Sequence, residues 1–365
     1  MTNARPTNVG IVGCGAISGI YCRNLSGFES TQLVACADIE EARARELAHR
    51  FGIPRALTTD ALLRDPEVDI VLNLTIPAAH AEVALGAVRA GKHVYNEKPL
   101  TIDLREAEQL LAEAEDGGVR VGAAPDTFLG AGLQTCRQLV DEGALGEVVG
   151  GSAFMVCPGH ESWHPDPAFY YQRGGGPLFD MGPYYLTALV MLLGPVLRVT
   201  GSTRRSFATR MISSEPRRGD RIAVEVPTHI SALLDFASGP VVNLTMSFDV
   251  QAARLPMLEL YGSRTSLSLP DPNTFHGPVE LFSHEAKAWE AIDLVDGFAE
   301  DSRGLGLAEM TAGLRQQRPH AAGGEMALHV LEIMHAVHEA SSTEQHVRLR
   351  TTCERPRLLD PAWRP

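Results

Sequence analysis

The residues near the start of the chain that could do chemistry are glycines placed directly after a short apolar run. Gly13 follows residues 9–12 and permits a tight turn, and Gly15 lets the backbone come close to a pyrophosphate. A helix that starts near Ala16 would aim free N–H groups and its positive dipole end at the phosphates. Ser18 stands where the strict G-x-G-x-x-G pattern has its third glycine, so the turn alone is a weak signal. It indicates a nicotinamide or flavin dinucleotide.

An acidic residue follows at a distance that suits the same cofactor. A second apolar run, residues 33–37, ends in Asp38, 19 residues beyond Gly19. A carboxylate at that spacing accepts hydrogen bonds from the adenine ribose diol. Asp38 could also cap the helix that follows it, and the two roles are compatible. Because Asp38 would repel a 2′-phosphate and no Arg follows it directly, the sequence favours NAD over NADP.

A lysine is the next candidate. The apolar run at residues 93–96 ends in Glu97-Lys98-Pro99, and ligands of a doubly wound sheet lie at the carboxyl ends of its strands. A lysine held there by the following proline would lie beside the cofactor. The alternative is an ordinary surface lysine before a proline that starts a helix.

The string His160-Glu161-Ser162-Trp163-His164 matches H-E-x-x-H, the signature of zinc proteases. That chemistry needs both histidines on one face of a helix. Prolines and a glycine flank the motif and leave no room for a long helix, and a third ligand is not evident. We therefore expect no metal here and interpret W-H-P-D-P as a loop that caps a pocket, with Trp163 able to stack on a sugar ring.

Up to about residue 125, strand-like and helix-like segments alternate. Helical patterns such as residues 78–90 and 104–114 end at glycines, which are C-cap signals. This alternation predicts an α/β fold with a parallel, doubly wound Rossmann sheet. The strands are expected at residues 8–12, 32–37, 56–58, 70–74, 93–96 and 119–123.

Beyond residue 125 the strands follow one another without helices between them, which predicts an α+β domain with a mostly antiparallel sheet. Its strands are expected at residues 147–156, 196–200, 228–236, 241–250, 257–261 and 266–269. Its helices are expected near residues 132–142, 184–193 and 324–340. The domains therefore span residues 1–125 and 126–346, and residues 347–365 form a polar tail.

Composition narrows the classes of partner. The chain has 365 residues with 44% hydrophobic and 21% charged residues, which is ordinary for a soluble globular protein. Its net charge of −13 argues against nucleic acid or an anionic membrane as partner. We expect no secretory signal and no transmembrane helix, because no run of about 18 apolar residues occurs. Six scattered cysteines without a C-x-x-C pair suggest buried thiols in a reducing cytoplasm.

The motifs occur in an order that resembles a known family. G-C-G-x-I-S, Asp38, N-L-T-I-P-A-A-H at residues 73–80, E-K-P and G-G-G-P-L-F-D-M-G at residues 174–182 resemble the Gfo/Idh/MocA oxidoreductases. These are relatives of glucose–fructose oxidoreductase and inositol dehydrogenase. The resemblance covers most of the chain and is strongest from residue 8 to about 200.

The resemblance implies roles for particular residues. The first domain would bind NAD(P), and the second would bind substrate against its large open sheet and form a homodimer or homotetramer. Lys98 would lie near both nicotinamide and substrate. The implied cofactor-binding residues are Gly13, Gly15, Ala16, Ile17, Asp38, Thr75, His80, Glu97 and Lys98. The implied catalytic or substrate-binding residues are Lys98, Trp163, His164, Asp180 and Tyr184. For His80, a place on a buried helix face is an equal alternative.

One position departs from the family pattern. The family signature D-x-G-x-H is matched by Asp180 and Gly182, but Tyr184 stands in place of the histidine. On one helix, residues four apart share a face, so Asp180 and Tyr184 could point into one pocket. Tyr184 could act as a base only if a cation such as Lys98 lowered its pKa; otherwise it would donate a hydrogen bond to substrate. His164 is a candidate substitute for the missing histidine.

These observations predict an NAD(P)-dependent oxidoreductase that transfers a hydride between nicotinamide and a secondary alcohol or ketone of a sugar, cyclitol or related polyol. One alternative is transient oxidation that serves glycoside cleavage or dehydration with no net redox change. A second alternative is a sensor that binds NAD and sugar without catalysis.

Overall fold

The computed structural model describes residues 5–365, and these divide into two compact units. One unit holds the described residues up to Leu129 together with Asp301–Leu328 and Leu359–Pro365. The other holds Gly130–Glu300 and His329–Leu358. Among the described residues, no helix is both long and apolar enough to cross a membrane.

The first unit is built on a parallel sheet of six strands in the order β3-β2-β1-β4-β5-β6. The predicted parallel, doubly wound sheet is therefore confirmed. The strand order reverses between β1 and β4, which is where sheets of this type bind ligands. The strands are β1 (Thr7–Val12), β2 (Thr31–Ala37), β3 (Ala56–Leu57), β4 (Ile70–Asn73), β5 (His93–Asn96) and β6 (Val121–Ala123).

Helices follow the strands of this unit, and α4 contacts α5 while α1 contacts α2 and α9. Tyr21, Ile70, Leu72 and Tyr95 are among the side chains with no exposed surface in its core. The helices are α1 (Ser18–Leu25), α2 (Glu41–Phe51), α3 (Thr59–Arg64), α4 (His80–Arg89), α5 (Leu104–Asp116) and α9 (Leu305–Arg315), with short 3₁₀ turns η1 (Pro77–Ala79) and η2 (Thr127–Leu129).

Helix α9 comes from the region that the sequence assigns to the second domain, yet it lies in the first unit. Gly306 makes this possible, because a Cβ there would lie 2.2 Å from the Tyr95 hydroxyl. The carboxylate of Asp126 accepts hydrogen bonds from the N–H groups of Gly304 (2.8 Å) and Gly306 (3.0 Å) at the start of this helix. The chain therefore returns to the first unit after the second has been built.

The second unit contains a nine-stranded sheet in the order β16-β15-β14-β13-β7-β12-β11-β8-β17, and a separate two-stranded hairpin, β9–β10. Within the large sheet, only β7 and β12 pair in parallel, so the expected mostly antiparallel sheet is confirmed. The strands are β7 (Val148–Val156), β8 (Val196–Arg204), β9 (Thr209–Met211), β10 (Arg221–Ala223), β11 (His229–Phe236), β12 (Val241–Ser247), β13 (Leu258–Gly262), β14 (Ser266–Ser268), β15 (Glu280–Ser283), β16 (Ala288–Ala291) and β17 (Val347–Arg348).

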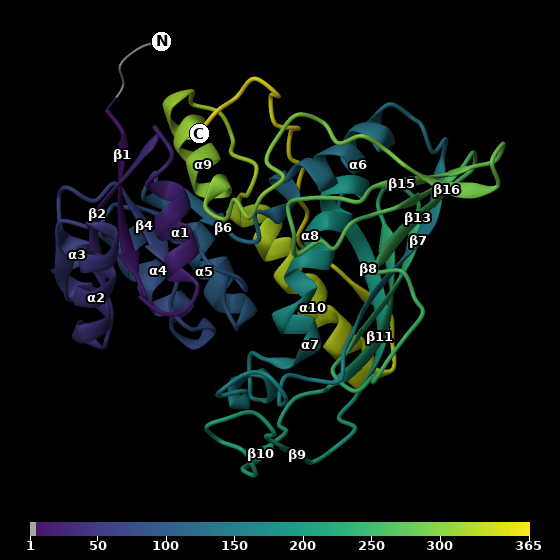
Figure 1. Cartoon of the computed structure of the whole chain (residues 1–365), viewed down its shortest axis with the longest axis horizontal. Helices are drawn as coiled ribbons and strands as arrows, with labels where there is room; N and C mark the ends of the chain where they lie inside the picture. Colours follow the sequence, from purple (N-terminus) through teal and green to yellow (C-terminus); the bar gives the residue numbers. More distant parts are fainter. Residues whose placement is uncertain (1–4) are drawn as a thin grey trace. The chain divides into compact units, whose positions relative to one another are not determined.

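The helices of this unit lie along one face of the large sheet (Figure 1). Every residue of α8 is buried, which explains its uniformly apolar sequence. The elements are α6 (Ala131–Asp141), η3 (Ala168–Tyr171), α7 (Gly176–Asp180), α8 (Gly182–Leu193) and α10 (Gly324–Thr343), which begins in the first unit.

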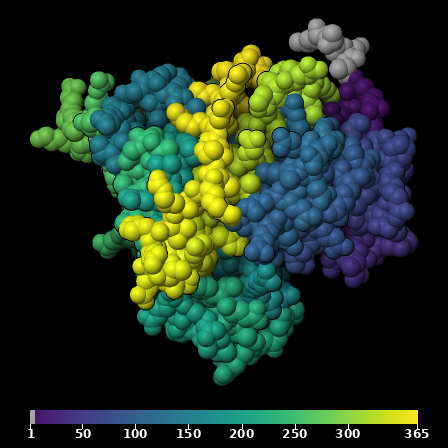
Figure 2. All heavy atoms as spheres, turned by 180° about the vertical axis from the view of Figure 1, so that it is seen from behind, coloured from purple at the N-terminus to yellow at the C-terminus, as the bar shows by residue number. Residues whose placement is uncertain are grey.

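The segment after α10 is anchored at specific points of the second unit. β17 pairs with β8, Arg137 donates to the Pro356 carbonyl (3.0 Å), and Glu332 accepts the Thr351 N–H (2.8 Å). Figure 2 shows this C-terminal segment, in yellow, on the surface. The residues expected to form a plain tail therefore include a strand and belong partly to each unit.

Candidate active site

The glycine turn after β1 has the geometry that a pyrophosphate requires. Gly13 has a φ of +99°, and a Cβ there would lie 2.5 Å from the Leu74 carbonyl carbon, so only glycine fits. A Cβ at Gly15 would meet nothing within 4 Å, which leaves space above the turn. Helix α1 begins at Ser18, its first turn has no acidic residue, and its N–H groups can therefore receive an anion.

Asp38 lies directly beside this turn at the carboxyl end of β2. Its Oδ2 accepts the Cys14 N–H (2.7 Å), and its Oδ1 accepts the Glu40 N–H (2.9 Å). The carboxylate thus joins the glycine turn to the approach of α2, which begins only at Glu41. Both expected roles are compatible with this position, since each oxygen can accept more than one hydrogen bond.

Three isoleucines surround this edge of the sheet with their side chains in solvent. Ile17, Ile39 and Ile76 follow β1, β2 and β4, and their exposed fractions are 36%, 95% and 70%. Exposed aliphatic side chains at the carboxyl ends of three adjacent strands suit the flat faces of adenine and nicotinamide rings. Together with the glycine turn and Asp38, the residues present fit a dinucleotide.

His80 has no exposed surface, and both of its ring nitrogens face backbone carbonyls. Nδ1 lies 2.6 Å from the Pro99 oxygen and Nε2 lies 3.0 Å from the Thr75 oxygen. Burial lowers the pKa of this imidazole. Both ring nitrogens are therefore occupied by backbone carbonyls. The imidazole joins the loop after β4, which carries Thr75, to the E-K-P segment after β5.

The side chain of Glu97 is likewise turned into the protein. One carboxylate oxygen accepts the Tyr21 hydroxyl (2.8 Å), and the other accepts the Lys98 N–H (2.8 Å). Burial raises the pKa of Tyr21, so its hydroxyl stays a donor. Glu97 fixes the backbone from which the half-buried Lys98 extends at the carboxyl end of β5. Its contribution is thus to position Lys98.

Asp180 and Tyr184 lie on two consecutive helices of the second unit, not on one. α7 ends at Asp180 and α8 begins at Gly182, with a break at Met181. Pro183 explains the break, because it has no N–H to donate to the carbonyl four residues earlier. The expected shared helix face is therefore wrong in its premise. Both Tyr184 and Tyr185 are largely buried, and burial raises the pKa of Tyr185.

The histidine beside Asp180 is His160. Its Nε2 lies 3.6 Å from the Asp180 Oδ2, and the two side chains are only 12% and 18% exposed. His164 lies elsewhere in the same segment: its Nδ1 accepts the Asp166 N–H (3.0 Å), and its ring contacts Phe169. Trp163 is 60% exposed, and its ring meets the His160 ring edge-on.

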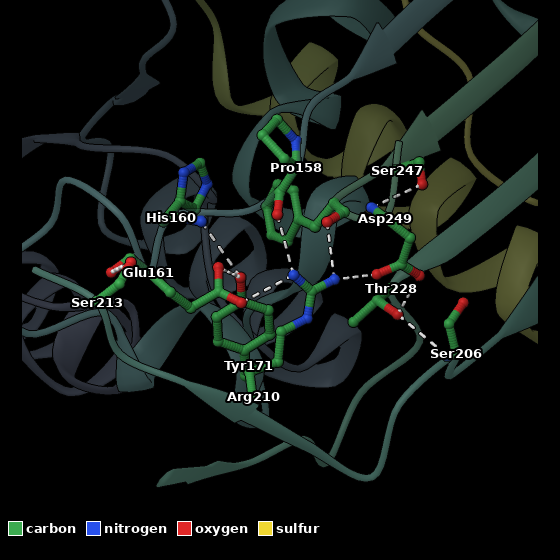
Figure 3. Close-up of polar contacts among 11 residues, drawn as sticks. Pro158, His160, Glu161, Tyr171, Ser206, Arg210, Ser213, Thr228, Ser247 and Asp249 are labelled. Carbon is green, nitrogen blue, oxygen red and sulfur yellow. Dashed lines mark hydrogen bonds and ion pairs between the residues drawn. The ribbon is translucent and has the colours of Figure 1, made fainter. Parts of the chain in front are cut away.

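The H-E-x-x-H string forms a single turn in which the His164 N–H donates to the His160 carbonyl (3.0 Å). Glu161 is buried, and its carboxylate accepts Arg210 Nη1 (2.8 Å) and the Tyr171 hydroxyl (2.5 Å), as Figure 3 shows. Within residues 5–365, no group of three or more His, Cys, Asp or Glu side chains could hold a metal ion. The Glu161 carboxylate is thus bound by Arg210 and Tyr171 inside the protein.

Sequence reasoning did not predict the contacts of His160 with Asp180 or of Arg210 with Glu161. Arg210 lies on the short strand β9, about fifty residues from the acidic side chain that it binds, so no local spacing signals the pair. His160 was visible only as part of a motif with an unsuitable local context. The tyrosine at position 184, where the family pattern has a histidine, was the one feature of the sequence that pointed to a histidine from another segment.

Comparison with known proteins agrees with the geometry of both units. Residues 7–124 match the family described as oxidoreductase family, NAD-binding Rossmann fold, and residues 133–268 match the GFO/IDH/MocA C-terminal domain. The dTDP-3,4-didehydro-2,6-dideoxy-alpha-D-glucose 3-reductase of Actinomadura kijaniata is 35% identical over 322 residues, 85% of this chain and 89% of that protein. The same-named enzyme of Streptomyces violaceoruber is 31% identical over 353 residues, 92% and 96% of the two chains.

A solved structure of levoglucosan dehydrogenase in complex with NADH and L-sorbose has the same fold, with a TM-score of 0.81 at 17% identity over 95% of this chain and all of that one. This structural similarity shows the fold. The family matches over residues 7–124 and 133–268 show to which family the chain belongs. The chain therefore belongs to the Gfo/Idh/MocA family of oxidoreductases, enzymes with an NAD-binding Rossmann domain.

Proposed function

We propose that the protein transfers a hydride between NAD and a secondary alcohol or ketone of a sugar, cyclitol or related polyol. The observation that carries the proposal is Lys98 at the carboxyl end of β5, on a backbone fixed by the buried Glu97. β5 pairs with β4, and β4 pairs with β1, so this lysine shares the sheet edge that carries the glycine turn.

In the proposed reaction the bound nicotinamide supplies the hydride chemistry, and the protein supplies position and charge. Lys98 donates a hydrogen bond to the reacting oxygen and stabilises the negative charge that develops on it. Asp180 accepts a hydrogen bond from a neighbouring hydroxyl group of the substrate. Tyr184 and His164 are the sequence candidates for completing the proton path, and Trp163 offers an exposed ring for stacking on a sugar.

We further propose a sugar linked to a nucleotide as the first substrate class to test. The support is that two relatives covering at least 85% of this chain are named as reductases of a keto sugar carried on dTDP. A reductase would work in the direction of ketone to alcohol with NADH. A free polyol such as myo-inositol or D-xylose, oxidised with NAD, is the second class.

NAD is proposed over NADP because the Asp38 carboxylate lies at the end of β2 beside the turn. Its negative charge would meet a 2′-phosphate. A cytoplasmic location and a homodimer or homotetramer are proposed as well. Support for assembly comes from exposed apolar side chains on strands of the large sheet, among them Val149, Leu197 and Leu233.

The test is absorbance at the NADH band with purified protein and four substrates: myo-inositol, D-xylose, levoglucosan and the dTDP-linked keto sugar named above. We expect turnover with one of them. Lys98→Ala should then lower kcat by about 10²- to 10³-fold, since it removes a positioned hydrogen-bond donor and positive charge from the reacting oxygen, while NAD affinity is nearly unchanged. Lys287→Ala, in an exposed turn, is the matched control and should behave as the wild type.

Other outcomes point to the rival functions. Consumption of a glycoside without change in NADH absorbance would support redox-neutral cleavage or dehydration. Binding of NAD without any reaction would support a sensor. Full activity of Lys98→Ala would contradict the mechanism even if the reaction itself were found.

A further inference from the structure

The family pattern expects a histidine at position 184, and this chain has a tyrosine there. The structure places a different imidazole at the matching aspartate. His160 Nε2 lies 3.6 Å from Asp180 Oδ2, within the distance of an ion pair. The two residues are twenty positions apart and come from a turn and from the end of α7. A histidine–aspartate pair is thus present, and its histidine comes from the turn at residues 160–164.

The Nε2 atom of His160 is buried and has no hydrogen-bond partner. Leaving a buried ring nitrogen without a hydrogen-bond partner costs free energy. A hydrogen bond to the Asp180 carboxylate, which this atom faces, would remove that cost. A small closing movement would turn the 3.6 Å approach into a hydrogen bond, as often occurs when a substrate binds. With Nε2 committed to Asp180, Nδ1 is the nitrogen that remains for a substrate.

Aromatic rings enclose the imidazole. The ring centroids of Tyr170, Phe248 and Trp163 lie 4.0, 4.5 and 5.3 Å from that of His160. The Trp163 side chain is largely exposed, so the shell has one side open to solvent. Rings that surround a histidine fix its orientation, and an exposed indole beside it suits the apolar face of a sugar.

The backbone on either side of His160 is held by Arg210 (Figure 3). Arg210 Nη1 donates to the Pro158 carbonyl (3.0 Å) and to the Glu161 carboxylate (2.8 Å). The His160 N–H itself donates to the Tyr171 hydroxyl (3.3 Å), which in turn donates to Glu161. Such a network, on both sides of one residue, is what a precisely placed functional side chain requires.

We infer that His160, oriented by Asp180, is the residue that exchanges the proton with the substrate oxygen; this rests on the proposed oxidoreductase function. In reduction, the ketone carbon receives the hydride and its oxygen receives the proton from Nδ1 of the imidazolium, giving the alcohol. The neutral imidazole then takes a proton from water. In oxidation, Nδ1 accepts the hydroxyl proton, and Asp180 stabilises the imidazolium that forms.

The first test uses variants and the substrate that gives turnover in the panel. His160→Phe keeps an aromatic ring in the shell and removes the proton carrier. We expect kcat to fall about 10²- to 10³-fold, with KM and NADH affinity within about threefold of wild type. Activity of His160→Ala should be partly restored by added imidazole, which a purely structural role would not allow. Full activity of His160→Phe, or equal loss in KM and kcat without rescue, would overturn the inference.

His164→Phe is the comparison within the same turn. If it loses kcat and regains it with imidazole while His160→Phe stays active, the proton carrier is His164. If both His160 variants unfold on heating well below the wild type, the comparison moves to Asp180→Asn, which keeps the size of the side chain. That variant should lower kcat, because the imidazolium loses its counter-charge.

The second test does not depend on turnover. In ¹⁵N-histidine-labelled protein saturated with NADH, long-range ¹H–¹⁵N spectra report which ring nitrogen carries the proton, and His160→Phe identifies the signal. The pair predicts the Nε2–H form in the wild type and its loss in Asp180→Asn. An Nδ1–H form that Asp180→Asn leaves unchanged would overturn the inference. If the Nε2–H form is found but no substrate in the panel reacts, the proposed function fails while the pair stands.

Discussion

At the scale of single residues, the proposed preference for NAD can be tested at Asp38. Its carboxylate accepts the Cys14 and Glu40 N–H groups, and in the proposed cofactor site its charge would also meet a 2′-phosphate. Asp38→Asn removes the charge and keeps one oxygen as acceptor. We expect the ratio of kcat/KM for NAD over NADP to fall by about tenfold to a hundredfold, equivalent to roughly 1.4–2.8 kcal/mol.

The measurement is steady-state kinetics with both cofactors at fixed substrate. Asp60→Asn, on an exposed helix of the same unit, serves as the control and should leave the ratio unchanged. A ratio that does not move in Asp38→Asn would mean that the carboxylate only holds the loop. A rise in the KM of NAD alone, with NADP still rejected, would lead to the same conclusion.

The sequence was sufficient to place those candidate site residues that follow a strand directly. Gly13 and Lys98 follow strands directly, and the parallel sheet brings the ends of those strands to one edge. The inferred choice of His160 over His164 could not be made in this way. The choice depends on Arg210, which reaches the segment from β9 and sets where the turn lies. For His80, only the folded structure shows the two carbonyl groups that hold its ring.

At the scale of elements, the turn that carries His160 depends on a buried charge cluster. Arg210 is paired with Glu161 and Asp249, and the side chains of all three are about 10% exposed or less. Arg210→Met would leave two buried carboxylates without their cation, which costs about 3–5 kcal/mol. We expect a lower melting temperature and a loss of activity, measured by thermal unfolding and by turnover. Arg45→Met, in an exposed pair, is the control and should change stability little.

A triple variant separates the effect of unpaired charges from the effect of lost side-chain packing. It carries Arg210→Met, Glu161→Gln and Asp249→Asn. If the unpaired charges cause the loss, the triple variant should recover much of the stability of Arg210→Met. The turn would still lack the donors that fix Pro158 and Glu161, so activity should remain low. Equal stability of the single and triple variants would show that packing of the arginine side chain, and not its charge, is what the segment needs.

Long elements with a clear pattern were predictable, and so were some short or fully buried ones, such as β14 and α8, whereas others were missed. β2 and β11 have the alternation or apolar run that their burial demands. β9, β10, β15 and β16 have only three or four residues each, too few for a pattern. Helix α9 is buried around most of its circumference, so it shows no polar face from which a helical period could be read.

At the scale of the whole molecule, the order of elements along the chain does not follow the division into units. The sequence shows where strand–helix alternation stops, and this placed the first boundary close to Leu129. It does not show that Asp301–Leu328 returns to the first unit. That return depends on contacts distant in sequence, such as the hydrogen bond from the N–H of Ala123, the last residue of β6, to the Ala322 carbonyl (3.0 Å).

Residues 301–328 return to the first unit, where the buried carboxylate of Asp126 binds the start of α9. The free energy of unfolding therefore depends on the protonation of this carboxylate. Asp126 is 1% exposed, and burial raises its pKa to about 6, while the Gly304 and Gly306 N–H groups oppose that rise. Between about pH 4 and pH 6 the folded protein therefore keeps a proton that the unfolded chain has released. The contribution of this proton to the free energy of unfolding has its full value below about pH 4. It is lost as the pH rises through 6, by about 3 kcal/mol in total.

Asp126→Asn tests this dependence, because an amide oxygen can still accept the two N–H groups but carries no charge at any pH. The free energy of unfolding, measured in urea from pH 4 to pH 8, should fall less steeply in the variant than in the wild type. The variant should thus gain on the wild type as the pH rises, by an amount that levels off above pH 7. The same substitution at Asp116, exposed at the end of α5, should give a curve parallel to the wild type. Parallel curves for Asp126→Asn as well would mean that the carboxylate is charged in the folded protein throughout this range, and that the glycine N–H groups outweigh its burial.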